Sequence, residues 1–154
     1  MKSNIVSATA VMRGGPLYPN IQGEVVFNQT KFGVEVTADI YGLPPFTRQD
    51  NLAISPFGFH IHEGEDCNAG SLENPFPNTL GHYNPYNQPH GNHAGDFPIL
   101  MPLSNGYAHM SFLTDKFTVE QVLGKALVIH QSPDDYRTQP TGNSGVKIAC
   151  GIII

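Results

Sequence analysis

The stretch Phe32-Gly-Val-Glu-Val-Thr-Ala-Asp-Ile40 decides the fold class of this 154-residue chain. Apolar and polar residues alternate along it, and a period of two is typical of a strand with one buried face. Residues 4–12 and 23–28 show the same alternation, and a turn-like Asn-Gln-Thr at 28–30 links the second of these segments to the next strand. The first third of the chain therefore predicts consecutive β-strands.

Five further segments have the composition of strands. They are Phe57–Glu63, Phe97–Leu103, Gly106–Phe112, Ala126–His130 and Val146–Ile153. Only Thr118–Leu123 indicates a helix, and the 16 glycines and 13 prolines indicate many turns. The sequence therefore predicts one all-β domain over residues 1–154, an eight-stranded Greek-key β-barrel or sandwich of immunoglobulin-like type.

The charge distribution argues against two classes of partner. The chain has 13 acidic and 8 basic residues, a net charge of −5, and no cluster of Lys and Arg. We therefore expect neither a nucleic-acid nor a membrane partner. The N-terminal segment lacks the apolar core of a signal peptide, so the sequence as given predicts a cytoplasmic protein, or a periplasmic or extracellular one if a leader was removed.

Two long connections interrupt the strand pattern, at residues 64–96 and 131–145. Long loops of this kind inside a compact domain are usually functional. Ordering each residue costs about 1–2 kcal/mol, so such loops need ligands or cross-links to hold them. Metal ligation and a disulfide are the candidates, although by composition alone Cys67 and Cys150 fit two buried thiols better than a disulfide.

One strand carries a pair of histidines in Gly58-Phe-His-Ile-His-Glu63. Side chains two residues apart on a strand share a face, so His60 and His62 point together while Phe59 and Ile61 point into the core. Two adjacent imidazoles make half of a metal site. Taken alone, the motif fits a solvent-facing pair of histidines better than a metal site.

The loop at 64–96 adds further metal-binding side chains. His82, His90, His93 and Asp96 fall within fifteen residues. Three histidines and a carboxylate suit a closed tetrahedral zinc site, whereas chance clustering of solvated histidines is the alternative. His130 ends a strand beside the second long loop, and on its own it fits a half-buried residue better than a ligand.

Five motifs together resemble those of the copper/zinc superoxide dismutases. In chain order they are GFHIHE, GHYNP, HGNHAGD, ALVIH and TGNSGVKIACG. The resemblance covers residues 4–154 and is nearest to the bacterial branch, because Cys67 follows the His-x-His pair closely. It implies an antioxidant enzyme that converts superoxide anion to O2 and H2O2 with copper and zinc as cofactors.

The resemblance also implies roles for individual residues. The implied copper ligands are His60, His62, His82 and His130. The implied zinc ligands are His82, His90, His93 and Asp96, with His82 bridging the two metals as an imidazolate. Asp134 matches the acidic residue that links ligands of both metals, and Cys67 and Cys150 match the intramolecular disulfide.

One position departs from the family pattern. Lys147 stands where the family has an arginine that docks the substrate anion, and with His82 it is the expected catalytic residue. Lysine keeps the positive charge but lacks the planar guanidinium that can donate two hydrogen bonds to one anion. We therefore expect a superoxide rate lower by about one order of magnitude, which corresponds to an activation free energy higher by roughly 1.4 kcal/mol. A solvated loop cation is the alternative for Lys147. The seventh histidine, His109, matches no ligand and is expected at the surface.

Two other functions compete with the dismutase. A non-catalytic copper- or zinc-binding relative, acting as a metal store or in copper delivery, would usually lack a copper ligand, and all four are present here. A zinc hydrolase would need an open zinc triad such as HExxH, which the sequence lacks. A homodimer is one of the assemblies that the resemblance allows.

Overall fold

The computed structural model describes residues 6–45 and 56–154, so the first two residues of the predicted strand 4–12 lie outside the described residues. The described residues form a curled antiparallel sheet of seven strands in the order β4-β6-β7-β1-β2-β3-β5. The strands are β1 Ser7–Gly14, β2 Gln22–Thr30, β3 Gly33–Tyr41, β4 Phe59–His62, β5 Ala108–Thr114, β6 Ala126–His130 and β7 Lys147–Ile152. A 3-10 turn at Pro77–Thr79 and a one-turn helix α1, Val119–Val122, are the other regular elements of the described residues.

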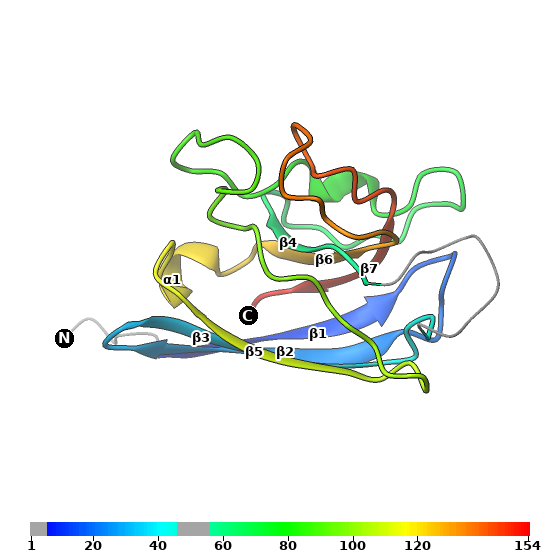
Figure 1. Cartoon of the computed structure of the whole chain (residues 1–154), viewed down its shortest axis with the longest axis horizontal. Coiled ribbons are helices and arrows are strands. Elements are labelled where there is room, and N and C mark those ends of the chain that lie inside the picture. Colours follow the sequence, from blue (N-terminus) through cyan, green and yellow to red (C-terminus); the bar gives the residue numbers. More distant parts are fainter. Residues whose placement is uncertain (1–5, 46–55) are drawn as a thin grey trace.

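The sheet curls into two layers that enclose the core (Figure 1). Strands β1, β2, β3 and β5 form one layer, and β4, β6 and β7 lie across it. Aromatic rings meet between the layers: the ring centroid of Phe97 lies 5.4 Å from that of Phe59 and 6.5 Å from that of Phe27. The alternation of apolar and polar residues that predicted the strands thus gives each layer an apolar face, and this face is buried against the opposite layer.

The histidine-bearing strands β4 and β6 lie side by side in register, with Ile61 opposite Leu127. Phe59 and Ile61 of β4, and Leu127 and Ile129 of β6, belong to the main core. Both strands are buried on their second face as well, because the two long loops cover it. The prediction that His60 and His62 point away from the core is confirmed.

The segment Phe97–Leu103 is not a strand, so the prediction of a strand there is wrong. Pro98 and Pro102 have no N–H to donate to a ladder, which limits the pairing. Only one bridge forms, in which the N–H groups of Phe57 and Leu100 each donate to the other residue's carbonyl over 2.9 Å. The described sheet therefore has seven strands where eight were predicted.

The first hairpin also turns later than predicted. Asn28–Thr30 continues β2, and the turn lies at Lys31 and Phe32. Gly33 leaves this turn with a φ of 133°, and the Thr30 hydroxyl accepts a hydrogen bond from the Phe32 N–H (3.1 Å). The predicted helix is confirmed as the single turn α1, and the N–H of Thr118, which precedes it, donates to the Gln121 side chain (2.8 Å).

A disulfide joins Cys67 of the first long loop to Cys150 of β7, across 83 residues of sequence. Cys150 packs with Val128 and Phe76 in a second, smaller apolar cluster behind the main core. The disulfide implied by the family resemblance is thereby confirmed. It fixes the start of the loop against the centre of the sheet.

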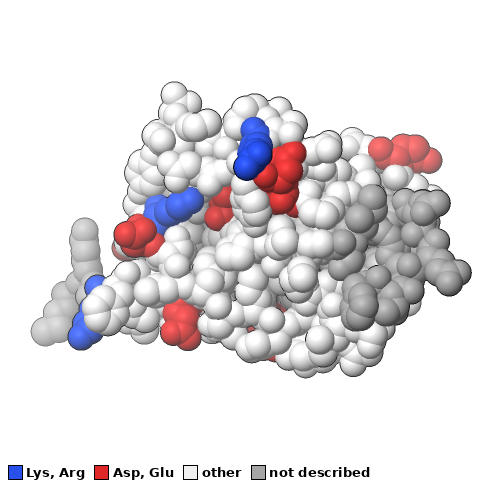
Figure 2. All heavy atoms as spheres, in the orientation of Figure 1, with Lys and Arg blue, Asp and Glu red and all other residues white. Residues whose placement is uncertain are grey.

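The surface shows no gathering of basic residues on the face drawn in Figure 2, where the few Lys and Arg side chains are scattered. Among the described residues, none of the helices has the length and apolar character needed to cross a membrane.

Candidate metal centre

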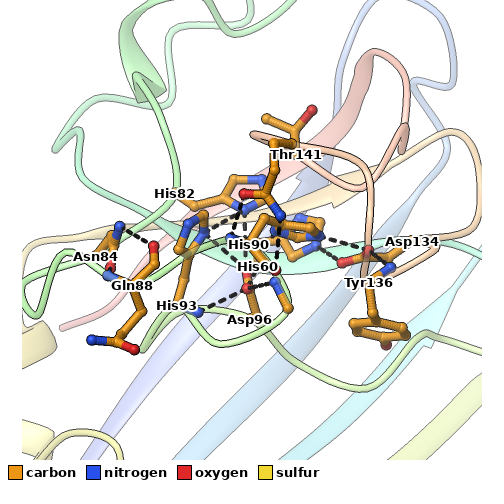
Figure 3. A network of polar contacts seen from close by, with 12 residues as sticks. His60, His82, Asn84, Gln88, His90, His93, Asp96, Asp134, Tyr136 and Thr141 are labelled. Atoms are coloured by element: carbon orange, nitrogen blue, oxygen red, sulfur yellow. Dashed lines mark hydrogen bonds and ion pairs between the residues drawn. The ribbon is translucent and has the colours of Figure 1, made fainter.

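Six imidazoles and two carboxylates meet beside β4 and β6, beneath the two long loops. Figure 3 shows His60, His82, His90 and His93 with Asp96 and Asp134. His60 and His62 come from β4, His130 ends β6, and the others come from the loops. Each of the six histidines is at most 6% exposed. The structure thus brings together every residue that the sequence predicted as a metal ligand, and Asp134 with them.

The first donor group contains the four predicted copper ligands. One ligand atom from each of His60, His62, His82 and His130 lies within 4.8 Å of the others. The rings of His60 and His82 stack with centroids 4.0 Å apart, and those of His62 and His130 stack at 5.2 Å. Four imidazole nitrogens at this spacing suit a copper ion.

Two of these rings are held in one tautomer by main-chain carbonyls. His62 Nδ1 donates to the carbonyl oxygen of Leu80 (2.8 Å), and His130 Nδ1 donates to that of Gly145 (3.0 Å). Each neutral ring therefore keeps a lone pair on Nε2. These two Nε2 atoms lie 3.1 Å apart, and two lone pairs at that distance repel unless a cation lies between them.

The rings are also held in the neutral form that binds metals. Burial, followed by the neighbouring imidazoles, lowers the pKa of His60 and of His62 well below the usual value. Burial lowers the pKa of His130 to about 4. Near neutral pH all three rings therefore have a free nitrogen lone pair.

The second donor group contains the four predicted zinc ligands, His82, His90, His93 and Asp96. Asp96 Oδ2 accepts hydrogen bonds from the N–H groups of Gly91 (2.9 Å) and His93 (3.0 Å). Its other oxygen, Oδ1, lies 3.0 Å from His82 Nδ1. Burial alone would raise the pKa of Asp96, but the hydrogen bond with His82 and the nearby imidazoles outweigh it and lower the pKa. The result is a carboxylate with three imidazoles, the donor set of a closed zinc site.

His82 belongs to both donor groups. Its Nδ1 faces the zinc group, 3.4 Å from His93 Nδ1. Its Nε2 is buried and has no hydrogen-bond partner, and the same is true of His60 Nδ1. Buried polar atoms are rarely left unpaired, so these two nitrogens fit ligands of a metal beside the stacked His60 and His82 rings.

Asp134 connects the two groups. Its Oδ2 accepts from His60 Nε2 (2.6 Å) and its Oδ1 accepts from His90 Nε2 (2.8 Å). Both rings therefore present Nδ1, without its proton, to the donor groups. Gly142 packs directly against this link: with a φ of 70°, a Cβ there would lie 2.0 Å from Asp134 Oδ1 and 2.4 Å from His90 Nε2.

The remaining predicted residues lie outside the two groups. Lys147 begins β7 opposite His130, is half-buried, and donates from Nζ to the carbonyl of Phe76 (3.3 Å). Burial lowers the pKa of Lys147. His109 lies on β5 with a side chain 54% exposed and pairs with Asp39 (2.8 Å), as expected of a surface residue.

Comparison with known proteins gives one family. The family model described as copper/zinc superoxide dismutase (SODC) matches residues 21–153. The chain is 35% identical to superoxide dismutase [Cu-Zn] 2 of Aquifex aeolicus, covering 87% of this chain and 82% of that protein. It is 36% identical to superoxide dismutase [Cu-Zn] of Legionella pneumophila, with 85% and 76% covered. The solved Cu/Zn superoxide dismutase from Brucella abortus superposes with a TM-score of 0.78 at 25% identity, over 96% of this chain and 99% of that one.

Replacing Gly142 with alanine should weaken zinc binding, because the added Cβ collides with the Asp134–His90 hydrogen bond. We expect the zinc affinity to fall by about tenfold or more, measured by competition with a chelator. Gly81→Ala is the matched control, since a Cβ at Gly81 meets nothing within 4 Å. Equal zinc affinity in both variants would contradict this role of Gly142.

The metal-free protein should lose stability in mild acid. The folded pKa of His130, about 4, lies below the usual 6.5, so between these values the folded protein binds fewer protons than the unfolded chain. The free energy of unfolding should therefore fall as the pH drops through this window, by up to about 1.4 kcal/mol per pH unit for each such histidine. Urea denaturation at pH 7 and pH 5 measures this, and His130→Asn should reduce the fall. A metal-free protein equally stable at both pH values would refute the prediction.

Proposed function

The chain belongs to the copper/zinc superoxide dismutase family, and we propose that His60, His62, His82 and His130 hold its copper ion. It is an oxidoreductase that acts on superoxide, with copper and zinc as its cofactors. The proposal extends to zinc at His82, His90, His93 and Asp96. The observation that carries it is the position of His82, a member of both donor groups with one ring nitrogen unpaired.

The two metals contribute differently. When bound, copper would alternate between two oxidation states, so that one superoxide becomes O2 and the next becomes H2O2, whereas zinc would keep a single oxidation state. The second half of the reaction also consumes two protons. We propose that His82 Nε2 would hold one of these protons only when it is released from copper, and would then deliver it to the substrate as a general acid.

The other side chains prepare this chemistry. The carbonyls of Leu80 and Gly145 keep His62 and His130 in the tautomer that exposes Nε2. Asp134 does the same for Nδ1 of His60 and His90. Because all these contacts are formed in the folded protein, the donors do not have to reorganise when a metal binds.

Lys147 is the proposed docking residue for the substrate anion. The protein carries a net charge of −5, so attraction of superoxide depends on local positive charge. Lys147 lies opposite His130 on the neighbouring strand, and its contact with the Phe76 carbonyl occupies one of its three N–H groups. The remaining N–H groups supply charge and donors, without the two-pronged geometry of an arginine.

Four further predictions belong to this proposal. They are a Greek-key barrel topology, one domain over residues 1–154, a monomer or homodimer without nucleic-acid or membrane partners, and a cytoplasmic, periplasmic or extracellular location. The first has support in the segment after Asp96, where the Phe97 N–H donates to the carbonyl of Phe59 (3.2 Å) and Leu100 bridges to Phe57. These contacts run along the free edge of β4 without forming a regular strand.

Replacing His130 with alanine should abolish superoxide removal but leave zinc bound, because His130 belongs only to the copper group. The wild-type protein, loaded with both metals, should contain one copper and one zinc per chain and remove superoxide. Metal analysis together with a superoxide assay measures both quantities. Two bound metals without activity in the wild type would instead favour a metal-store or copper-delivery protein.

Lys147→Arg should raise the superoxide rate by about tenfold, whereas Lys147→Met should lower it most at low ionic strength. Lys31→Met is a suitable control, since Lys31 lies in the turn between β2 and β3. Rates measured over a range of salt concentrations separate docking from folding effects. If neither Lys147 variant changes the rate, Lys147 is only a solvated cation.

A further inference from the structure

One side-chain amide pairs with the main chain of a predicted zinc ligand. Gln139, in the second long loop, accepts at Oε1 from the N–H of His90 (2.7 Å) and donates from Nε2 to the carbonyl of His90 (3.1 Å). The same Nε2 also donates to the carbonyl of Arg137 (3.1 Å) in its own loop. The amide thus satisfies both main-chain groups of His90, as a neighbouring strand would.

His90 is consequently fixed at three points by the second loop. Asp134 accepts from its ring at Nε2 (2.8 Å), while Gln139 holds its main chain on both sides. The ring cannot turn without breaking the bond to Asp134, and the backbone cannot shift without breaking those to Gln139. Together these hydrogen bonds fix the position of His90 Nδ1, which lies 3.3 Å from Asp96 Oδ2.

The two loops are also in direct contact beside this pair. Gly91 has a φ of 94°, and a Cβ there would lie 2.4 Å from the carbonyl oxygen of Tyr136. The Tyr136 hydroxyl in turn donates to the carbonyl of Phe97 (2.9 Å). No strand ladder forms at His90, so the hydrogen bonds to Asp134 and Gln139, together with the close approach of Gly91 to Tyr136, attach residues 90–91 to the second loop.

We propose that Gln139 is a positioning residue for zinc, which sets the main chain of His90 so that Nδ1 meets the metal. The inference rests on the proposed function for its zinc ligands. Outer partners of metal ligands commonly change metal affinity by about 10–100-fold when they are removed. Gln139 differs from most such partners in acting on the backbone of the ligand rather than on its ring.

The test compares Gln139→Met with Gln88→Met. Methionine has nearly the size of glutamine but cannot replace the two hydrogen bonds, and Gln139 is otherwise exposed, so the change leaves no cavity in the core. Gln88 is the matched control, because its side-chain amide lies in the first long loop and contacts Tyr86 and Asn92 but no predicted metal ligand. Gln139→Asn, one methylene shorter, serves as a second variant if the first does not fold.

Three measurements should change for Gln139→Met and stay unchanged for Gln88→Met. In the metal-free protein the His90 amide should exchange with deuterium at least about tenfold faster. Zinc affinity, measured by chelator competition, should fall by about 10–100-fold. The visible spectrum of Co2+ bound in place of zinc should shift, which a general loss of stability would not cause.

The inference is overturned if zinc affinity and the Co2+ spectrum of Gln139→Met match the wild type. A His90→Ala variant separates this failure from that of the proposed function. If His90→Ala loses zinc and Gln139→Met does not, only the role of Gln139 is wrong. If His90→Ala keeps zinc at wild-type affinity, the ligand assignment itself is wrong.

Discussion

The carboxylate of Asp134, shared between His60 and His90, is the interaction on which the rest of the site depends. One oxygen accepts from a ring on β4 and the other from a ring in the first long loop, while the residue itself belongs to the second loop. A single buried carboxylate therefore joins the sheet and both loops. It also determines which nitrogen of each ring faces the metal. The same hydrogen bonds therefore attach the loops to the sheet and fix the tautomers of the two rings.

The sheet supplies the rigid half of the site. Adjacent strands β4 and β6 carry three of the six histidines, and their opposite faces pack into the aromatic core. The loops supply the other half and would be costly to order alone. The disulfide at Cys67, the Asp134 link and the Gln139 pair each attach them. Metal binding adds to this network, so that zinc should stabilise the loops as well as complete the donor set.

Much of this arrangement could be predicted from the sequence, and the exceptions have physical reasons. Alternation places His60 and His62 on one face, because strand geometry is local. The strand predicted over Phe97–Leu103 fails, because two prolines limit its pairing to one bridge. The contacts of Leu80, Gly145 and Gln139 carry no sequence signal, because main-chain carbonyls and a loop amide acquire their partners only when distant segments meet. Asp134 and the disulfide could be identified only through the family resemblance.

We propose that His82 joins the two metals through its two ring nitrogens. The most direct test is the Cu2+ electron paramagnetic resonance spectrum of protein that carries Co2+ in place of zinc. Two paramagnetic ions on one imidazolate are magnetically coupled, so the Cu2+ signal should largely disappear when one copper and one cobalt are bound per chain. A Cu2+ signal of full intensity at that stoichiometry would contradict the shared ligand.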